Sequence, residues 1–177
     1  MVRPFAYARH RQHDEDDEGD EDDEDDGVAK QLKRERACGV LLFQRRPREA
    51  FLVLYRKDGS PDLPKGKVDG DETDVQTALR ELSEETGIRP DQVRLTPGFA
   101  FENTYATRSK KTGEPVEKTV RVFHGVIDDP VAVVLEVHAD YAWIPWAPLD
   151  TLHAQIRDNP TLLGAVQAWS LAQKAPA

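Results

Sequence analysis

Three glutamates lie close together near the middle of the chain, at a spacing that would place them on one side of a helix. Glu81, Glu84 and Glu85 stand at i, i+3 and i+4, so a helix would bring their side chains together. Like charges this close destabilise a helix by about 0.2–0.5 kcal/mol per pair. Oxygen ligands at this density suit Mg²⁺ or Mn²⁺, which bind phosphate oxygens as well. The cluster is therefore a candidate metal site, and the alternative is a solvated acidic helix face.

A helix that carries these glutamates is indicated between Thr73 and Gly87. The segment Thr73-Asp74-Val75-Gln76 has the capping-box pattern of a helix start, and Gly87 is a typical C-terminal stop. An apolar stripe at helical spacing, which we expect to pack on a sheet, lies between them: Val75, Ala78, Leu79 and Leu82. The glutamates would then lie beside the buried face of the helix.

Apolar runs of strand length accompany this helix, at residues 37–43, 51–55, 99–107, 119–127 and 141–146. The charged loop Arg45–Glu49, which contains Pro47, predicts a hairpin between the first two runs. A second helix is expected after Asn159, which can cap a helix whose first residue is Pro160. Two helices among these strands predict an α+β sandwich built on a mixed sheet.

The chain has 177 residues and a formal net charge of −9, and the excess comes from one segment. Residues 14–26 hold twelve carboxylates in thirteen positions, whereas residues 27–177 carry equal numbers of acidic and basic side chains. We expect residues 1–29 to form a disordered acidic tail and residues 30–177 to form one domain. The tail would serve as a solubilising appendage, as an arm that contacts a basic partner, or as an intramolecular competitor for a cation-lined site.

Composition also excludes several classes of protein. No apolar run approaches the ~18 residues that a membrane span needs, and residues 2–13 lack the apolar stretch of a secretory signal. A single cysteine, Cys38, excludes an intramolecular disulfide and a cysteine-rich zinc site. The neutral domain offers no broad basic face to a nucleic-acid backbone. We therefore expect a cytoplasmic protein with no membrane and no stable nucleic-acid partner.

The residues around the glutamates form a longer pattern. From Gly66 the chain reads Gly, five residues, Glu72, seven residues and then Arg80-Glu81-Leu82-Ser83-Glu84-Glu85-Thr86-Gly87-Ile88. At every fixed position this resembles the Nudix box, the signature of the Nudix hydrolase superfamily. The resemblance implies a Nudix-type α/β/α sandwich in which a loop–helix–loop carries metals. It also implies a pyrophosphohydrolase, a divalent-metal-dependent enzyme that splits phosphoanhydride bonds in compounds of a nucleoside diphosphate linked to another group.

The same resemblance implies roles for individual residues. Glu81, Glu84 and Glu85 are expected to bind Mg²⁺ or Mn²⁺, with the main-chain carbonyl of Lys65 or Gly66 as a further ligand. Metals clustered there would neutralise charge on the phosphates and make a water molecule more acidic.

Two further residues of the box are expected to support the site. These are Glu72 and Arg80, and Arg80 would pair with carboxylates to hold the loop against the helix. A glutamate that the metal does not fully use would accept the proton of the water. The family's late motif generally has a glutamate directly before a histidine, but here Val137 holds that position and Glu136 lies one residue earlier. Three contenders for the base therefore remain open: Glu85, Glu84 and Glu136.

Segments outside the box resemble the diadenosine tetraphosphate hydrolase branch of the superfamily: Leu63-Pro64-Lys65-Gly66-Lys67-Val68, Lys118-Thr119-Val120 and His138-x-x-Tyr141-x-Trp143. By this resemblance Lys65 and Lys118 contact the polyphosphate. Tyr105 is expected to stack on an adenine ring, and the alternative is a buried core tyrosine. Two positions depart from the branch, Pro61 where a tryptophan is common and Gly70-Asp71 in place of Pro-Gly.

The expected substrate is a dinucleoside polyphosphate such as diadenosine tetraphosphate. Within the enzyme class the alternatives are nucleoside triphosphates, the 5′ end of RNA, and inositol or sugar polyphosphates. A different class is a non-catalytic nucleotide-sensing module, which would be expected to lose carboxylates of the box, and this chain keeps them all.

Overall fold

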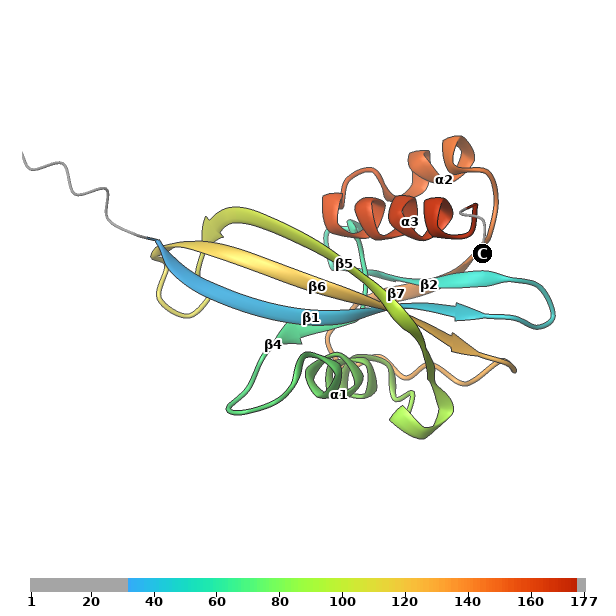
Figure 1. Cartoon of the computed structure of the whole chain (residues 1–177), viewed down its shortest axis with the longest axis horizontal. Helices are drawn as coiled ribbons and strands as arrows, with labels where there is room; N and C mark the ends of the chain where they lie inside the picture. Colours follow the sequence, from blue (N-terminus) through green and yellow to red (C-terminus); the bar gives the residue numbers. More distant parts are fainter. Residues whose placement is uncertain (1–31, 175–177) are drawn as a thin grey trace, which may run out of the picture. The chain divides into compact units, whose positions relative to one another are not determined.

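The computed structural model describes residues 32–174, and these residues form a sheet with helices on both faces (Figure 1). The strands are β1 (Lys33–Gln44), β2 (Ala50–Tyr55), β3 (Pro61–Asp62), β4 (Lys65–Lys67), β5 (Arg94–Arg108), β6 (Pro115–Ile127) and β7 (Asp140–Pro145). The helices are α1 (Asp74–Thr86), α2 (Leu149–Ile156) and α3 (Pro160–Ala172), with a 3-10 turn at Pro90–Gln92. Helix α1 covers one face, and α2 and α3 cover the other. The predicted α/β/α sandwich is confirmed, while the predicted tail, residues 1–29, lies outside the described residues.

The sheet is mixed, and its centre is a parallel pair. Strand β1 runs parallel to β6 from Lys33 beside Val116 to Gln44 beside Ile127. The order β3-β2-β1-β6-β5 is otherwise antiparallel. The predicted hairpin of residues 37–55 is present as β1 and β2, which pair at Phe43–Phe51 and Gln44–Ala50.

The segment that precedes α1 follows β2 in the sequence, but in the sheet it lies between β1 and β2. Beyond their hairpin end, β3 pairs with β2 and β4 pairs with β1. Pro64 lies between these two short strands in the sequence, and its carbonyl accepts a hydrogen bond of 3.1 Å from the amide of Val40 in β1. Strand β4 is therefore held at the middle of the sheet, directly beside α1.

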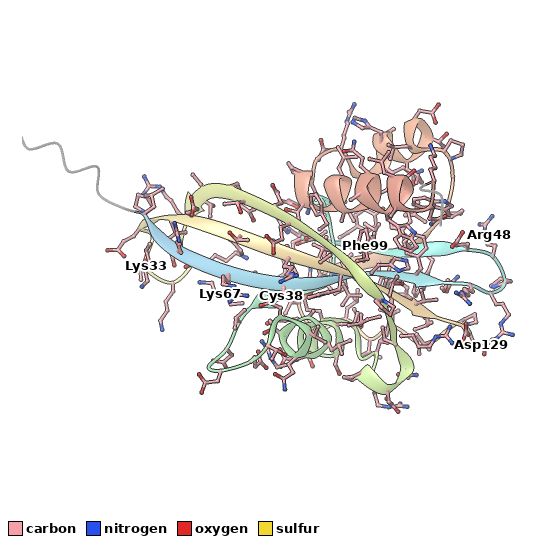
Figure 2. All side chains as sticks on the ribbon, viewed as in Figure 1. Lys33, Cys38, Arg48, Lys67, Phe99 and Asp129 are labelled. Carbon is pink, nitrogen blue, oxygen red and sulfur yellow. The ribbon has the colours of Figure 1, made fainter. Side chains whose placement is uncertain are left out.

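Two apolar clusters hold the layers together, one on each face of the sheet (Figure 2). Successive residues of β1 point to opposite faces, as the alternation of a strand requires. Leu41 packs with Leu162 and Val166 of α3, whereas Val40 packs with Ala78 and Leu82 of α1. Both faces of the central strand are therefore buried.

Helix α1 begins and ends where its sequence signals predict. The Thr73 hydroxyl accepts from the amide of Gln76, and the Gln76 side chain accepts from the Thr73 amide at 2.8 Å, which completes the capping box. Gly87 adopts φ +71°, and its amide donates to the Ser83 carbonyl at 2.8 Å. Gly87 therefore provides the left-handed conformation that ends the helix.

One part of the predicted apolar stripe is wrong, because Val75 is 39% exposed. In this first turn the contact with the sheet is made by ion pairs of Asp74 with Arg36 and Arg121. The residues of α1 that are buried are Thr77, Ala78, Leu82 and Thr86.

Other elements differ from the sequence prediction in extent. Helix α2 was not predicted, because it is short and follows Pro148 closely. Strand β5 begins at Arg94 rather than Phe99, with a register shift between Leu95 and Ala100. Within residues 32–174, no helix is long and apolar enough to cross a membrane.

Candidate active site

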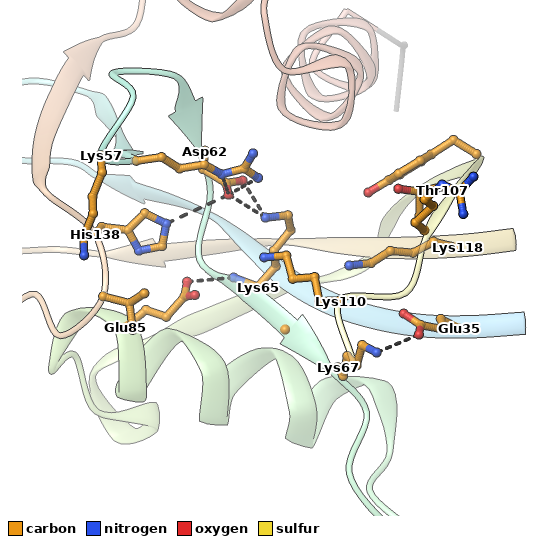
Figure 3. Close-up of a pocket in the computed structure, with 15 residues that line it drawn as sticks. Glu35, Lys57, Asp62, Lys65, Lys67, Glu85, Thr107, Lys110, Lys118 and His138 are labelled. Atoms are coloured by element: carbon orange, nitrogen blue, oxygen red, sulfur yellow. Dashed lines mark hydrogen bonds and ion pairs between the residues drawn. The ribbon is translucent and has the colours of Figure 1, made fainter. Parts of the chain in front are cut away.

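A cavity of about 570 Å³ opens beside β4, between the C-terminal half of α1 and the β5–β6 hairpin (Figure 3). Its lining includes many basic side chains: Arg56, Lys57, Lys65, Lys67, Arg108, Lys110 and Lys118. The carboxylates in the lining are fewer: Glu35, Asp62 and Glu85. A cleft with such an excess of one charge concentrates ligands of the opposite charge. The cavity therefore suits a strongly anionic ligand such as a chain of phosphates.

Two of the predicted metal ligands meet the main chain of β4. A Cβ placed on Gly66 would lie 2.0 Å from the carboxylate carbon of Glu81, so the Glu81 carboxylate lies directly against the backbone of Gly66. The amide of Lys65 donates to Glu85 Oε2 at 3.1 Å. Gly66 therefore lets the Glu81 carboxylate approach the backbone of β4, and a Cβ at this position would displace that carboxylate.

Arg80 joins the loop before α1 to the helix itself. Its Nε donates to Glu72 Oε1 at 2.8 Å, and its Nη2 donates to Glu72 Oε2 and to the Lys67 carbonyl, both at 3.0 Å. Its Nη1 donates to Glu81 Oε1 at 2.8 Å and to Glu84 Oε2 at 3.1 Å. The hydrogen bonds from Arg80 lower the pKa of Glu72 to about 2. One guanidinium therefore anchors the loop and offsets the charge of the acidic cluster.

The three glutamates of α1 differ in their surroundings. The Glu84 side chain is 56% exposed, whereas that of Glu81 is 15% exposed. Glu85 lines the cavity, and burial raises the pKa of its carboxyl group. Within residues 32–174, no set of three acidic, histidine or cysteine side chains converges as metal ligands, and Arg80 occupies oxygens of Glu81 and Glu84. The donors nevertheless fit a hard divalent cation, because the carboxylates of Glu81 and Glu85 lie against adjacent residues of β4, Gly66 and Lys65 respectively.

Lys65, a predicted phosphate contact, is held by a carboxylate that the sequence analysis missed. Its Nζ lies 2.6 and 2.7 Å from the two oxygens of Asp62. Arg56 donates to Asp62 Oδ2 from Nε at 2.9 Å and from Nη2 at 2.6 Å. Burial by itself would raise the pKa of Asp62, but His138, Lys65 and Arg56 together hold it well below its usual range. The floor of the cavity is therefore a compact network of one carboxylate and two cations.

This network extends to the last helix. Asn159, the N-cap residue of α3, donates from Nδ2 to Asp62 Oδ1 at 3.1 Å and to the Pro61 carbonyl at 3.0 Å. Its Oδ1 accepts from the Leu162 amide at 2.9 Å, which caps the helix. The side chain that the sequence predicts as a cap therefore also holds the cavity floor.

Lys118, the other predicted phosphate contact, also lines the cavity. No ion pair within residues 32–174 involves Lys118 or its neighbour in the cavity, Lys110. Burial, followed by the charges of Lys65 and Lys110, lowers the pKa of Lys118. This end of the cavity therefore carries positive charge that the described protein does not neutralise.

Two other predicted residues have different outcomes. Tyr105 of β5 lines the cavity and is 36% exposed, so it is not a buried core tyrosine. Glu136 is exposed and is not among the residues that line the cavity, although Val137 and His138 are. The structure therefore does not bring Glu136 to the other site residues.

The cavity residues that were not predicted from the sequence have only weak sequence signals. Asp62 directly precedes the Leu-Pro-Lys-Gly segment, and Arg56 and Lys57 directly follow a predicted strand. His138 belongs to a motif that was noted without a role, and its Nε2 lies 3.9 Å from Asp62 Oδ2. Their convergence depends on the insertion of β3 and β4 between β1 and β2, which no local pattern predicts.

Both the sequence and the fold of this chain are similar to those of known proteins. The family model described as the NUDIX domain matches residues 33–163. The asymmetrical bis(5′-nucleosyl)-tetraphosphatase of Mus musculus is 38% identical over 120 residues, which cover 62% of this chain and 78% of the mouse protein. An RNA pyrophosphohydrolase of Xylella fastidiosa is 39% identical over 64 residues, 34% of this chain and 33% of that protein. The structure of a C. elegans Ap4A hydrolase binary complex has a TM-score of 0.65 at 23% identity, covers 79% of this chain and 98% of that chain, and shows the fold alone.

Proposed function

The chain belongs to the Nudix family of hydrolases, and on that premise we propose that it hydrolyses dinucleoside polyphosphates such as diadenosine tetraphosphate. The observation that carries this proposal is the cavity, in which basic side chains from β4, β5, β6 and the segment after β2 face the acidic helix α1. The mouse relative supports the same substrate class, since its name states that it acts on bis(5′-nucleosyl) tetraphosphates.

We propose that Glu81, Glu84 and Glu85 hold a divalent cation, Mg²⁺ or Mn²⁺, with the main-chain carbonyl of Gly66 or Lys65 as a further ligand. The close approach of Glu81 to Gly66 and the hydrogen bond from Lys65 to Glu85 support this set. When bound, such a cation supplies charge neutralisation on the phosphates and makes the attacking water more acidic.

The side chains of this chain have separate tasks in the proposed reaction. Lys118 binds the phosphate chain, and Lys65 presents its charge from a position fixed by Asp62. Tyr105, half-exposed on the cavity wall, offers its ring to a nucleobase. Glu85 accepts the proton of the attacking water, because among the contenders for the base it is the one that lines the cavity.

Product analysis tests this function directly. Purified protein with Mg²⁺ is incubated separately with diadenosine tetraphosphate, ATP, RNA with a 5′ triphosphate, and an inositol polyphosphate, and the products are separated by chromatography. We expect diadenosine tetraphosphate to be the best substrate and to give ATP and AMP. Failure to cleave any dinucleoside polyphosphate would overturn the proposal.

A second candidate function is removal of pyrophosphate from the 5′ end of RNA. It is favoured by the similarity to an RNA pyrophosphohydrolase over 64 residues. Release of pyrophosphate from the triphosphate RNA, with no cleavage of diadenosine tetraphosphate in the same panel, would establish this alternative.

A further inference from the structure

We propose that the tip of the β5–β6 hairpin forms a phosphate subsite in which Lys110, together with Lys118, binds the phosphates farthest from the glutamates of α1. The inference rests on the proposed function in taking a polyphosphate as the ligand. It makes Lys110 a specificity-determining residue for the number of phosphates in the substrate.

Ion pairs are distributed unevenly around the cavity. Lys65 and Arg56 share Asp62, and Lys67 pairs with Glu35 at 2.7 Å. The other basic residues of the lining have no ion-pair partner within residues 32–174: Arg108, Lys110 and Lys118 belong to the β5–β6 hairpin, and Lys57 alone lies at the opposite end, after β2. The charge available to a ligand is therefore concentrated at the hairpin end of the cavity.

Lys110 and Lys118, which have no ion-pair partner within the described residues, repel one another. After burial, the charges of Lys65 and Lys110 are the largest causes that lower the pKa of Lys118. Figure 3 shows Lys110 and Lys118 on one side of Lys65, with Glu85 on the other. An anion bound between the two ammonium groups would relieve their repulsion. A polyphosphate that starts at Glu85 and passes Lys65 would reach this point with its distal phosphates.

The tip of the β5–β6 hairpin has a defined conformation. Ser109 is 6% exposed, its amide donates to the Glu114 carbonyl at 2.8 Å, and its carbonyl accepts from the Gly113 amide at 2.8 Å. Arg108 Nη1 donates to the Gly113 carbonyl at 3.0 Å. Hydrogen bonds from Lys67 and then Ser109 lower the pKa of Glu35 on β1, so the tip also contacts the sheet. Lys110 therefore projects over the cavity from an ordered turn rather than from a free loop.

The chain offers a matched control for this subsite. Lys111 is the next residue along the tip and carries the same charge, but it does not line the cavity. The variants Lys110→Gln and Lys111→Gln therefore change the net charge equally and differ in access to the ligand.

Kinetics give the first test. We expect Lys110→Gln to raise the KM for diadenosine tetraphosphate about tenfold with kcat little changed, as for the loss of one charge-assisted hydrogen bond. The increase should be smaller for diadenosine triphosphate, which has one phosphate fewer to place at the tip. Lys111→Gln should leave both KM values unchanged. Equal effects of the two variants, or no effect of either, would overturn the subsite.

Binding gives a second test that does not depend on turnover. Calorimetry of inorganic tripolyphosphate and pyrophosphate with metal-free protein measures the anion site alone. We expect Lys110→Gln, but not Lys111→Gln, to weaken tripolyphosphate binding more than pyrophosphate binding. If this selective weakening is found but the protein cleaves no dinucleoside polyphosphate, the phosphate subsite is supported and the proposed substrate is rejected. Unchanged tripolyphosphate binding in Lys110→Gln would reject the subsite alone.

Discussion

Asp62 and Lys65 form a buried ion pair at the floor of the cavity, with both carboxylate oxygens within 2.7 Å of the lysine Nζ. The Asp62 side chain is 3% exposed, and Arg56 binds the same carboxylate. Lys65 is thus not a free surface lysine. Its position is fixed in advance, and part of its charge is offset before any ligand arrives.

Replacement of Asp62 tests this network. Asp62→Asn leaves the largely buried Lys65 and the half-exposed Arg56 without their counter-ion, so we expect the free energy of unfolding to fall by roughly 3 kcal/mol in urea denaturation. The folded state depresses the pKa of Asp62, so its contribution is present above about pH 4 and is lost as the pH falls below that value. Asp71→Asn, at an exposed position, is the control. Equal stability of the two variants at pH 7 would contradict the role of Asp62.

Neutralising the cavity-facing glutamate should abolish most turnover and leave the fold intact. Glu85→Gln removes the charge but keeps an oxygen that can accept from the Lys65 amide, so we expect kcat to fall at least about 100-fold with no loss of thermal stability in the metal-free protein. Glu84→Gln should also lower turnover by weakening cation binding. Glu136→Gln, which alters an exposed residue outside the cavity, should retain near-normal kcat. Near-normal turnover of Glu85→Gln and Glu84→Gln at saturating Mg²⁺ would refute the metal assignment.

A methyl group at position 66 should displace Glu81. The Cβ of Gly66→Ala would lie 2.0 Å from the Glu81 carboxylate carbon, which is the far end of a flexible side chain, so we expect the carboxylate to move aside, with a higher Mg²⁺ concentration for half-maximal activity and little loss of stability. Gly70→Ala strains a backbone at φ +50° but meets no atom within 4 Å. This control should lose some stability without a change in Mg²⁺ dependence, and a similar Mg²⁺ shift in both variants would argue against the steric explanation.

A buried histidine should make stability depend on pH. His124 is 2% exposed, stacks on Trp169 at 3.5 Å between ring centroids, and bonds Thr96 Oγ1 through Nδ1 at 2.7 Å. Burial lowers the pKa of His124 to about 4. Because the unfolded histidine titrates near pH 6.5, the folded state loses roughly 3 kcal/mol relative to the unfolded state as the pH falls from about 6.5 to 4.

Paired variants isolate this effect. In unfolding experiments between pH 7 and 4, His124→Phe should lose less stability than the wild type over that interval. His153→Gln, on the exposed side of α2, should follow the wild type. Parallel pH profiles for all three proteins would show that His124 does not titrate as described.

The predictable parts of the structure are those with local signals. Helix α1 has its cap at Thr73 and its stop at Gly87, and both lie within a few residues of the hydrogen bonds they make. Glu81, Glu84 and Glu85 could be located for the same reason, because their spacing and the surrounding box lie in one short segment. Which of them faces the cavity could not be predicted, since the orientation of α1 depends on its packing against β1 and β4.

The network around Asp62 shows why the rest escaped prediction. Asp62 and Asn159 are 97 positions apart, and they meet because β3 and the start of α3 converge at one edge of the sheet. An acidic residue next to a lysine-containing motif, or an asparagine before a proline, has no pattern that reveals this contact. Helix α2 was missed for a different reason, because eight residues after a proline give too little periodicity.

The side-chain amide of Asn159 makes contacts at both ends. Its oxygen caps α3, and its nitrogen donates to Asp62 and to the Pro61 carbonyl. A substitution there would disturb the last helix and the cavity floor together, although the residue does not line the cavity. In a random mutagenesis screen, position 159 should therefore behave like an active-site position. Among diverged relatives, residues 62 and 159 should change as a pair, so a compensating change at one should rescue a loss at the other.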